Sequence, residues 1–176
     1  HLFSFSKSLF PGARVGAITT RGRLVEAALA LKQASDLSDA LPLQAALAHL
    51  LENGEYDRHL VRLRRVLRER RDALVEALEA EMPPGSRWTV PEGGYQVWVE
   101  LPEAIDTRDL LTDAIGAGVL FAPGSQFHHD GRKSHALRLT FAMAESADLR
   151  RGVSRLARCI HERLEKNPGR LNRVHI

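Results

Sequence analysis

The chain has 176 residues, of which 44% are hydrophobic and 27% are charged. This is enough apolar material for one ordinary domain, or one and a half small ones, around a real core, and it excludes intrinsic disorder. The net charge of +3 is too mild to indicate a nucleic-acid or membrane partner by itself, and the single cysteine, Cys159, excludes a disulfide framework within the chain.

Hydropathy and the first residues narrow the class further. No run of about 18 apolar residues is present, so no transmembrane helix is expected. The opening residues lack the order of a signal peptide, which favours the cytoplasm. Because the chain starts without methionine and with strand-like residues, we expect a piece of a longer protein, in which a site that also uses upstream residues is incomplete.

The first part of the chain predicts two strands and two helices. Pro11 and Gly12 separate two short apolar segments, after which apolar residues recur at helical intervals. Residues 35–42 contain Asp, Ser and Pro and predict a connection, and Asn53 with Gly54 predicts a helix end. In chain order the predicted elements are a strand at 2–5, a loop at 6–14, a buried strand at 15–19, and helices at 21–33 and 43–51.

The second part begins with the longest periodic segment, residues 55–81. Its apolar side and its arginine-rich remainder predict a helix long enough to bridge two parts of a structure. A Pro-Pro-Gly sequence at 83–85 then marks a candidate domain boundary. Beyond it we expect a small α+β domain, with helices packed on a largely antiparallel sheet and with Trp88 and Trp98 in the core. The predicted strands are at 87–90, 95–101, 119–122 and 136–141, and the predicted helices at 107–117 and 147–165.

Lys7 is the first residue that could carry chemistry. It follows apolar Phe5 at the end of a predicted strand, and partial desolvation there would favour a neutral amine that can act as a Schiff-base nucleophile. Ser4 and Ser6 offer hydroxyl donors, and Arg14 offers a planar bidentate donor that suits a phosphate. Together they match the needs of a phosphorylated aldehyde cofactor. From the pattern alone, an exposed loop lysine and a surface arginine are the simpler interpretation.

Arg138 is the second candidate, in the predicted strand ALRLTFA. Alternation points its side chain to the face opposite Leu137 and Leu139. An unpaired charge in a strand otherwise suited to burial is costly, so Arg138 in such a strand requires an anion partner. An arginine on the solvent face of the sheet is the commoner alternative.

Two further clusters have simpler structural interpretations. His128, His129, Asp130 and His135 are metal-ligand types, but neighbouring residues rarely converge on one ion and no Cys or HExxH spacing supports zinc, so no metal site is predicted. The arginines within residues 62–71 could contact nucleic-acid phosphates. Apolar residues interrupt them at helical spacing and no aromatic residues lie between them, so a solvated helix face paired with nearby carboxylates is the better interpretation.

Several blocks of the chain, in one order, resemble a known family. SFSKSLFPGARVG at residues 4–16 matches the pattern S-x-S-K-x-x-x-P-G-x-R-x-G of fold-type I, class I/II pyridoxal-phosphate aminotransferases. The resemblance extends down nearly the whole chain. The further blocks are LKQASDL, EYDRHLVRLR with RRDAL, PEGGYQVWVELP, GVLFAPGSQF and ALRLTFA.

The resemblance implies an α/β fold, a cofactor and a role for each candidate residue. Residues 1–54 would be the end of the large domain that binds pyridoxal 5'-phosphate, residues 55–82 a bridging helix, and residues 83–176 the small α+β C-terminal domain. Lys7 would be the catalytic lysine that forms the internal aldimine and later moves the proton. Ser4, Ser6 and Arg14 would bind the cofactor phosphate, Arg138 would bind the substrate α-carboxylate, and the loop at 122–131 would face the substrate entrance.

The implied reaction moves an amino group between an amino acid and a 2-oxo acid through the lysine aldimine, usually in a homodimer. The same module also resembles the effector-sensing domain of MocR-type regulators of the GntR group, where DNA is bound only through an N-terminal domain that this chain lacks. A scaffold that has lost its cofactor is a third hypothesis, and the retained lysine, serines and arginines argue against it. Because the family's other cofactor contacts lie upstream of the lysine, we expect the isolated chain to bind the cofactor weakly and to have negligible transaminase activity.

Overall fold

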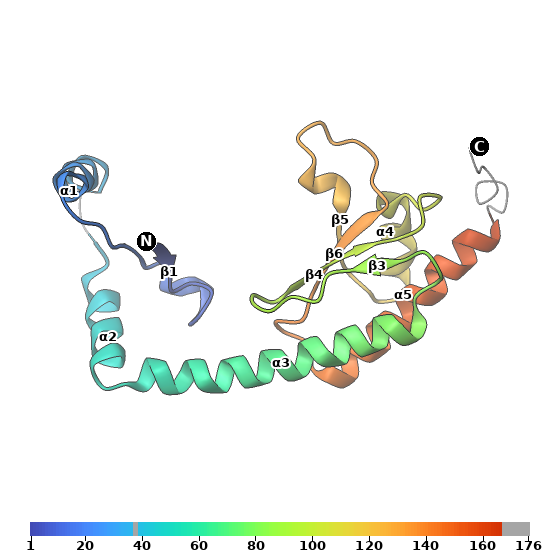
Figure 1. The fold of residues 1–176 in the computed structure, drawn as a ribbon, viewed down its shortest axis with the longest axis horizontal. Coiled ribbons are helices and arrows are strands. Elements are labelled where there is room, and N and C mark those ends of the chain that lie inside the picture. The colour runs from blue at the N-terminus through green and yellow to red at the C-terminus, as the bar shows by residue number, and fades with distance from the viewer. Residues whose placement is uncertain (37–38, 167–176) are drawn as a thin grey trace. The chain divides into compact units, whose positions relative to one another are not determined.

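The computed structural model describes residues 1–36 and 39–166. Strands and helices are mixed along the chain, as the sequence predicts for an α/β fold (Figure 1). The chain divides into two compact units, a first unit of His1–Arg64 and a second unit that starts at Arg65. The boundary lies within one long helix, α3.

The first unit opens with a hairpin. Strands β1 (Leu2–Ser4) and β2 (Gly16–Ile18) pair antiparallel, with Leu2 opposite Ile18 and Ser4 opposite Gly16. The expected strands are therefore present, but the prediction that the second is buried is wrong, since Ile18 is 64% exposed. A two-stranded ribbon gives neither strand a neighbour on both sides, and the groove between this ribbon and the next helix stays open.

Two helices follow the hairpin, α1 (Arg23–Ser35) and α2 (Leu41–Glu52). The prediction that Pro42 belongs to the connection is wrong, because it lies in the first turn of α2. Proline suits that position because an N–H in the first turn has no helical acceptor. Asn53 caps α2 and Gly54 takes a φ of +66°, which ends the helix at the predicted place. The long helix α3 then spans Glu55–Glu81, as predicted.

The second unit is built on a four-stranded sheet in the order β3-β4-β6-β5, and all its pairings are antiparallel, as expected. Its elements are β3 (Arg87–Trp88), β4 (Gln96–Glu100), α4 (Thr107–Gly116), β5 (Ala122–Pro123), a 3₁₀ turn η2 (Gly124–Phe127), β6 (Ala136–Thr140) and α5 (Ser146–Lys166).

The strand expected at 119–122 is largely wrong, because only Ala122 of that segment enters the sheet. The backbone N–H of Val119 instead donates to the carbonyl of Ala114 at 2.8 Å and completes the end of α4. Gly118, with a φ of +78°, allows the chain to turn back there.

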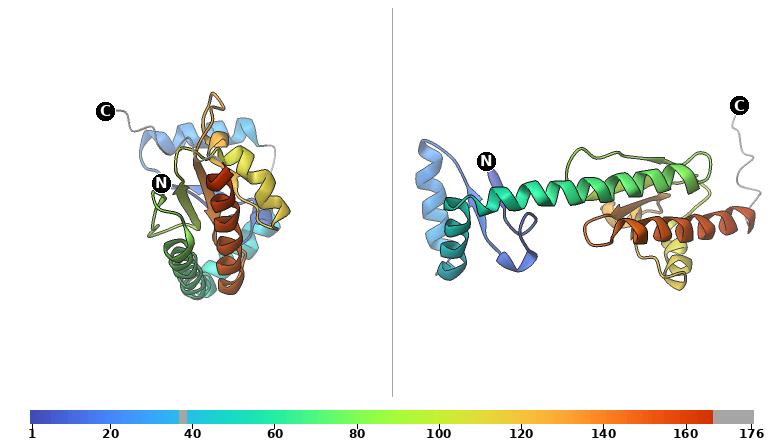
Figure 2. Two further views of the ribbon diagram at one scale, coloured as in Figure 1. Left: turned by 90° about the vertical axis from the view of Figure 1, so that its right-hand side faces the viewer. Right: turned by 90° about the horizontal axis from the view of Figure 1, so that it is seen from below.

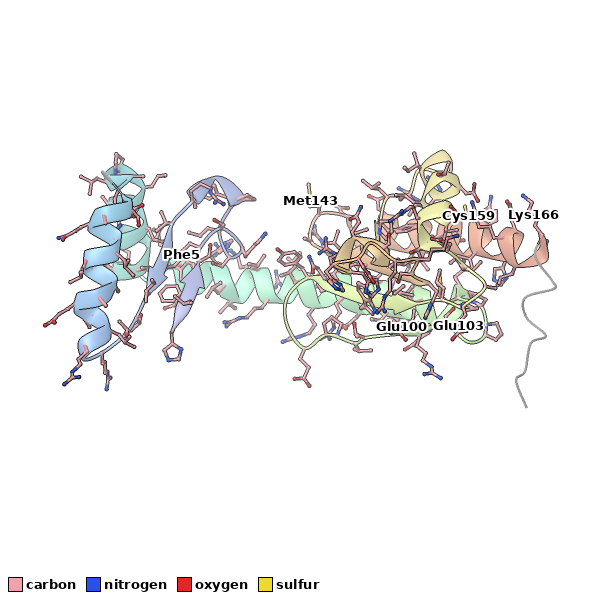
Figure 3. The ribbon with its side chains drawn as sticks, turned by 90° about the horizontal axis from the view of Figure 1, so that it is seen from above. Phe5, Glu100, Glu103, Met143, Cys159 and Lys166 are labelled. Atoms are coloured by element: carbon pink, nitrogen blue, oxygen red, sulfur yellow. The ribbon has the colours of Figure 1, made fainter. Side chains whose placement is uncertain are left out.

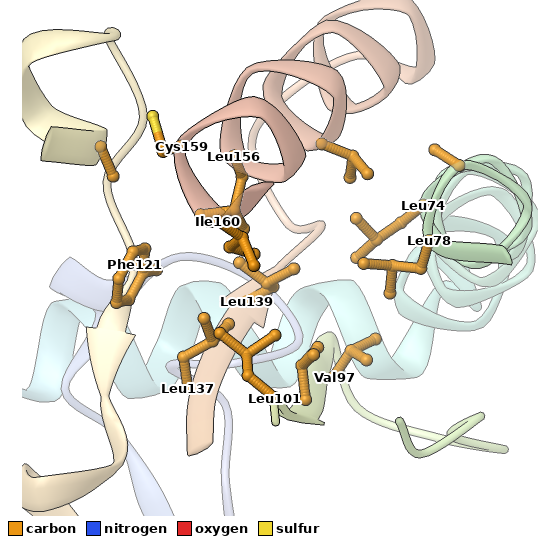
Figure 4. Packing of buried hydrophobic residues seen from close by; sticks show 14 of the residues in the cluster. Leu74, Leu78, Val97, Leu101, Phe121, Leu137, Leu139, Leu156, Cys159 and Ile160 are labelled. Carbon is orange, nitrogen blue, oxygen red and sulfur yellow. The ribbon is translucent and has the colours of Figure 1, made fainter. Parts of the chain in front are cut away.

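One face of this sheet carries the core. Alternate residues of β4 and β6 point to that face, which the second half of α3 together with α4 and α5 covers (Figure 2). In Figure 4, Leu74 and Leu78 of α3 and Leu156 and Ile160 of α5 reach toward it. Trp88 packs against this core as expected, but Trp98 has the opposite parity in β4 and points away from it.

No helix in the described part of the chain combines the length and the apolar character that crossing a membrane requires.

Cys159 is free and buried in the core, where burial raises the pKa of its thiol.

Leu78 tests the core directly, because its side chain is fully buried. We expect Leu78→Ala to lower the free energy of unfolding of the second unit by about 2–5 kcal/mol, through lost burial and the cavity left behind. Urea unfolding followed by tryptophan fluorescence measures this, since both tryptophans lie in the second unit. The matched control is Leu120→Ala at a side chain that is 78% exposed. A loss below about 1 kcal/mol for Leu78→Ala would contradict this account of the core.

Candidate functional site

The hairpin of the first unit gathers four of the predicted site residues at one end. Its ladder continues beyond the strands: the N–H of Phe5 donates to the carbonyl of Val15 at 3.0 Å. Ser6 and Arg14 begin and end the connection between Phe5 and Val15. Ser4, at the end of β1, and Ser6, Lys7 and Arg14 of this connection therefore all belong to the closed end of one hairpin.

The return of the chain to Arg14 depends on an unusual backbone. The 3₁₀ turn η1 (Pro11–Ala13) ends at Arg14, whose φ of 46° and ψ of 29° are left-handed. Among the described residues, Arg14 is the one non-glycine residue with a positive φ. Such a conformation costs about 1 kcal/mol and is held only where its surroundings require it. Ala13, buried just before it, anchors the turn.

Burial differs sharply among these four residues. Ser6 is buried, and its backbone N–H donates to the Ser4 hydroxyl at 3.3 Å. Lys7 and Arg14 are exposed. The expectation that Phe5 desolvates Lys7 is therefore wrong for this chain. Phe5, which is labelled in Figure 3, instead packs edge to face against Tyr56. The centroids of the two rings lie 5.6 Å apart.

A contact that sequence reasoning missed ties this loop to α3. The Tyr56 hydroxyl donates to Ser8 Oγ at 2.8 Å, and His59 Nε2 lies 2.7 Å from the Ser8 carbonyl oxygen. The available signal was their spacing, because residues three apart lie on one face of a helix. That spacing says nothing about which loop the face meets.

In the second unit, Arg138 lies on the face of the sheet opposite the core, as alternation predicts. It pairs across the ladder with Trp98 on one side and Ala122 on the other. Its guanidinium lies 4.8 Å from the centre of the Phe127 ring, and this ring packs edge to face with Trp98 at 5.4 Å. Arg138 forms no ion pair with any residue in the described ranges. Its cation is therefore oriented by an aromatic surface and is available to an external anion.

The loop that presents Phe127 is held by a compact polar contact. The Thr107 hydroxyl, fully buried, lies 2.8 Å from the carbonyl oxygens of both Ser134 and Ala136 and can donate to either. A Cβ on Gly124 would lie 2.4 Å from Ser134 Oγ and 2.6 Å from the Ala136 carbonyl oxygen, so only glycine fits there. This packing fixes η2, and with it Phe127, beside β6 and Arg138.

The arginine-rich segment at 62–71 and the histidine cluster at 128–135 are the two other clusters that the sequence contains. Arg70 and Arg71 of the arginine-rich segment donate to the carbonyls of Ala142 and Pro91 within the second unit. Arg65 lies 4.0 Å from Glu69 on the exposed side of α3. No group of three or more potential ligands that could hold a metal ion is found in the described ranges.

Comparison with known proteins shows which family the chain belongs to. The family model "Aminotransferase class I and II" matches residues 2–156. The chain belongs to this aminotransferase family. The match includes the hairpin loop of the first unit and the Arg138 strand of the second.

Relatives of this chain include proteins named as aminotransferases and proteins named as transcriptional regulators. It is 37% identical to "Aromatic-amino-acid aminotransferase 1" of Thermococcus litoralis over 94% of the chain. It is 30% identical to "Uncharacterized HTH-type transcriptional regulator YdfD" of Bacillus subtilis over 92% of the chain. The crystal structure of LysN, an α-aminoadipate aminotransferase of Thermus thermophilus complexed with N-(5'-phosphopyridoxyl)-L-leucine, superposes with a TM-score of 0.84 at 35% identity over 94% of the chain.

The chain spans only part of each of these proteins. It corresponds to 40% of the Thermococcus aminotransferase, 33% of the regulator and 42% of LysN. These matches show that the chain has the fold of the corresponding part of the aminotransferase family.

Gly124 offers a test of how the Phe127 loop is held. Gly124→Ala places a methyl group against two oxygens and should lower the free energy of unfolding of the second unit by about 1–3 kcal/mol. The matched control, Gly152→Ala, lies within α5 with nothing near its Cβ and should raise it by up to about 1 kcal/mol through helix propensity. Urea unfolding followed by tryptophan fluorescence compares them, and equal effects of the two substitutions would rule out the close approach at Gly124.

Proposed function

We propose that the full gene product containing this chain is a pyridoxal-phosphate-dependent aminotransferase that exchanges an amino group between an amino acid and a 2-oxo acid. The observation that carries this proposal is the hairpin of β1 and β2, whose closed end contains Ser4, Ser6, Lys7 and Arg14. Family membership and a relative solved with a phosphopyridoxyl ligand support it.

The donor set of the loop fits the cofactor chemically. Arg14 carries a permanent cation with a bidentate donor face, and the hydroxyls of Ser4 and Ser6 add neutral donors, which together suit a phosphate. The strained backbone of Arg14 is consistent with a position selected for its side chain, since glycine would adopt that φ at lower cost. Pyridoxal phosphate, when bound, supplies an aldehyde that amines can attack and a ring that withdraws electrons from the amino-acid Cα.

Each residue of this chain then has a separate task. Lys7 Nζ would hold the cofactor and, once released, would move a proton at the substrate Cα, first as base and then as acid. Lys7 is exposed in this chain. Arg138 binds the α-carboxylate through its fork of N–H donors, and Phe127 keeps the guanidinium plane in place.

A second function is supported by one specific observation, the similarity to the HTH-type regulator YdfD. In a regulator the same residues would hold the cofactor and an amino-acid effector without turnover, and DNA would be bound by a separate domain. An assay of the full gene product separates the two: transfer of an amino group to a 2-oxo acid supports the enzyme, and sequence-specific DNA binding without turnover supports the regulator.

Lys7 is tested by covalent trapping. We expect the full gene product, incubated with pyridoxal phosphate and reduced with borohydride, to carry a phosphopyridoxyl group on the peptide that contains Lys7. Lys7→Ala should abolish this label and the activity. Lys133→Ala, at a lysine side chain that is 86% exposed, serves as the matched control and should retain both. A label on another lysine, or one unaffected by Lys7→Ala, would refute the assignment.

Arg138 is tested by a substitution that keeps its charge. Arg138→Lys loses the fork and its stacking on Phe127, so we expect the KM for the amino acid to rise roughly 10- to 100-fold, as for the loss of one charged hydrogen bond. Arg132→Lys, in the exposed loop that precedes β6, is the control. Steady-state kinetics over a range of amino-acid concentrations measure the change, and a KM within twofold of the unmodified protein would argue against the carboxylate role.

A further inference from the structure

The turn that carries Lys7 is held by contacts on both sides of the lysine. The N–H of Leu9 donates to the carbonyl of Phe5 at 2.9 Å, which closes a turn with Lys7 at its centre. Phe5 is fixed by the β ladder and by the ring of Tyr56. Ser8, directly after the lysine, contacts α3 through both its side chain and its backbone.

The two bonds at Ser8 have a defined chemistry. The Tyr56 hydroxyl donates to Ser8 Oγ at 2.8 Å, which leaves the serine proton free to donate elsewhere. A carbonyl oxygen can only accept, so His59 Nε2 must carry the proton in its 2.7 Å contact with the Ser8 carbonyl. One bond holds the side chain and the other holds the peptide plane, so together they fix the direction in which the chain leaves Lys7.

The hydrogen bonds at Ser8 matter for the position of the turn because few residues around them are buried. In the described part of the first unit, the buried residues are few and scattered, namely Phe5, Ser6, Ala13 and Leu47. No apolar core therefore fixes the turn against α3. Tyr56, His59 and Ser8 are half-buried, where a hydrogen bond is stronger than one in open water.

We propose that Tyr56 and His59 are positioning residues for Lys7. By binding the hydroxyl and the carbonyl of Ser8, they set the place from which the lysine amine reaches the cofactor and the substrate. This inference rests on the proposed function of Lys7. A lysine has a long, flexible side chain, so its useful range of positions depends on where its Cα is held. Small errors in the position of a reacting group lower rates steeply.

The experiment uses the full gene product with four substitutions. Tyr56→Phe removes only the hydroxyl, Ser8→Ala removes its acceptor, His59→Ala removes the donor to the carbonyl, and His59→Gln restores an amide N–H close to the same place. Arg64→Gln, exposed on the same helix, is the matched control. Three readouts are taken: amide hydrogen exchange of the peptide containing residues 5–10 in the cofactor-free protein, the rate of phosphopyridoxyl labelling at Lys7, and kcat with KM.

We expect Tyr56→Phe and His59→Ala to speed exchange in residues 5–10 and to lower the labelling rate and kcat about 10- to 100-fold, with KM within about twofold. His59→Gln should recover most of this loss, and Arg64→Gln should match the unmodified protein. Tyr56→Phe combined with Ser8→Ala should be no worse than either alone, because both remove one bond. The melting temperature should fall little, since no core is opened.

Contrary results separate two conclusions. If the unmodified protein is labelled at Lys7 but the substitutions leave labelling and kcat within twofold, the positioning role is wrong and the proposed function stands. If kcat falls only in step with the folded fraction, or His59→Gln fails to recover what His59→Ala loses, the positioning role is likewise overturned. If the unmodified protein is not labelled at Lys7, the proposed function fails and the positioning role fails with it.

Discussion

Antiparallel pairing of β1 with β2 is the constraint on which the first part of the candidate site depends. The ladder runs from the His1 and Thr19 backbones through Phe5 and Val15, and its register decides which residues meet at the closed end. A shift of one residue in a strand moves every side chain to the other face. Such a shift would change which residues lie opposite one another near the closed end, even though each residue kept its place in the sequence.

In the second unit, the two faces of one sheet have different roles. The residues of β4 and β6 that pair as Val97 with Leu139 and Val99 with Leu137 are buried under helices. The pair between them, Trp98 with Arg138, faces the other way. A buried core on one face thus holds a cation on the opposite face at a fixed position, without the cost of burying an unpaired charge.

Local pattern predicted much of this fold, and its failures have physical reasons. Helical spacing and the stop at Gly54 gave α3 with its observed bounds, and alternation gave the orientation of Arg138. Burial was harder to predict, because it depends on which other parts of the chain lie nearby. Strand β2 and the side chain of Trp98 are apolar, but their neighbours in space could not be predicted from the local sequence.

The same limit applies to the candidate site. Lys7, Ser4, Ser6 and Arg14 are close in sequence and belong to one motif, so residue types and family resemblance could single them out. The contact of Ser8 with Tyr56 and His59 joins residues about fifty positions apart. Only a three-dimensional arrangement reveals such a pairing, because helical spacing shows which residues share a face and not what that face meets.

The contact between Trp98 and Phe127 has an optical consequence. Both tryptophans of the protein lie in the second unit, but Trp88 packs against the core while Trp98 shares its face with Arg138. An indole's emission responds to nearby charge and to the mobility of its neighbours. The protein therefore carries one indole that reports on the state of the core and another that reports on changes around the Arg138 guanidinium and the Phe127 ring.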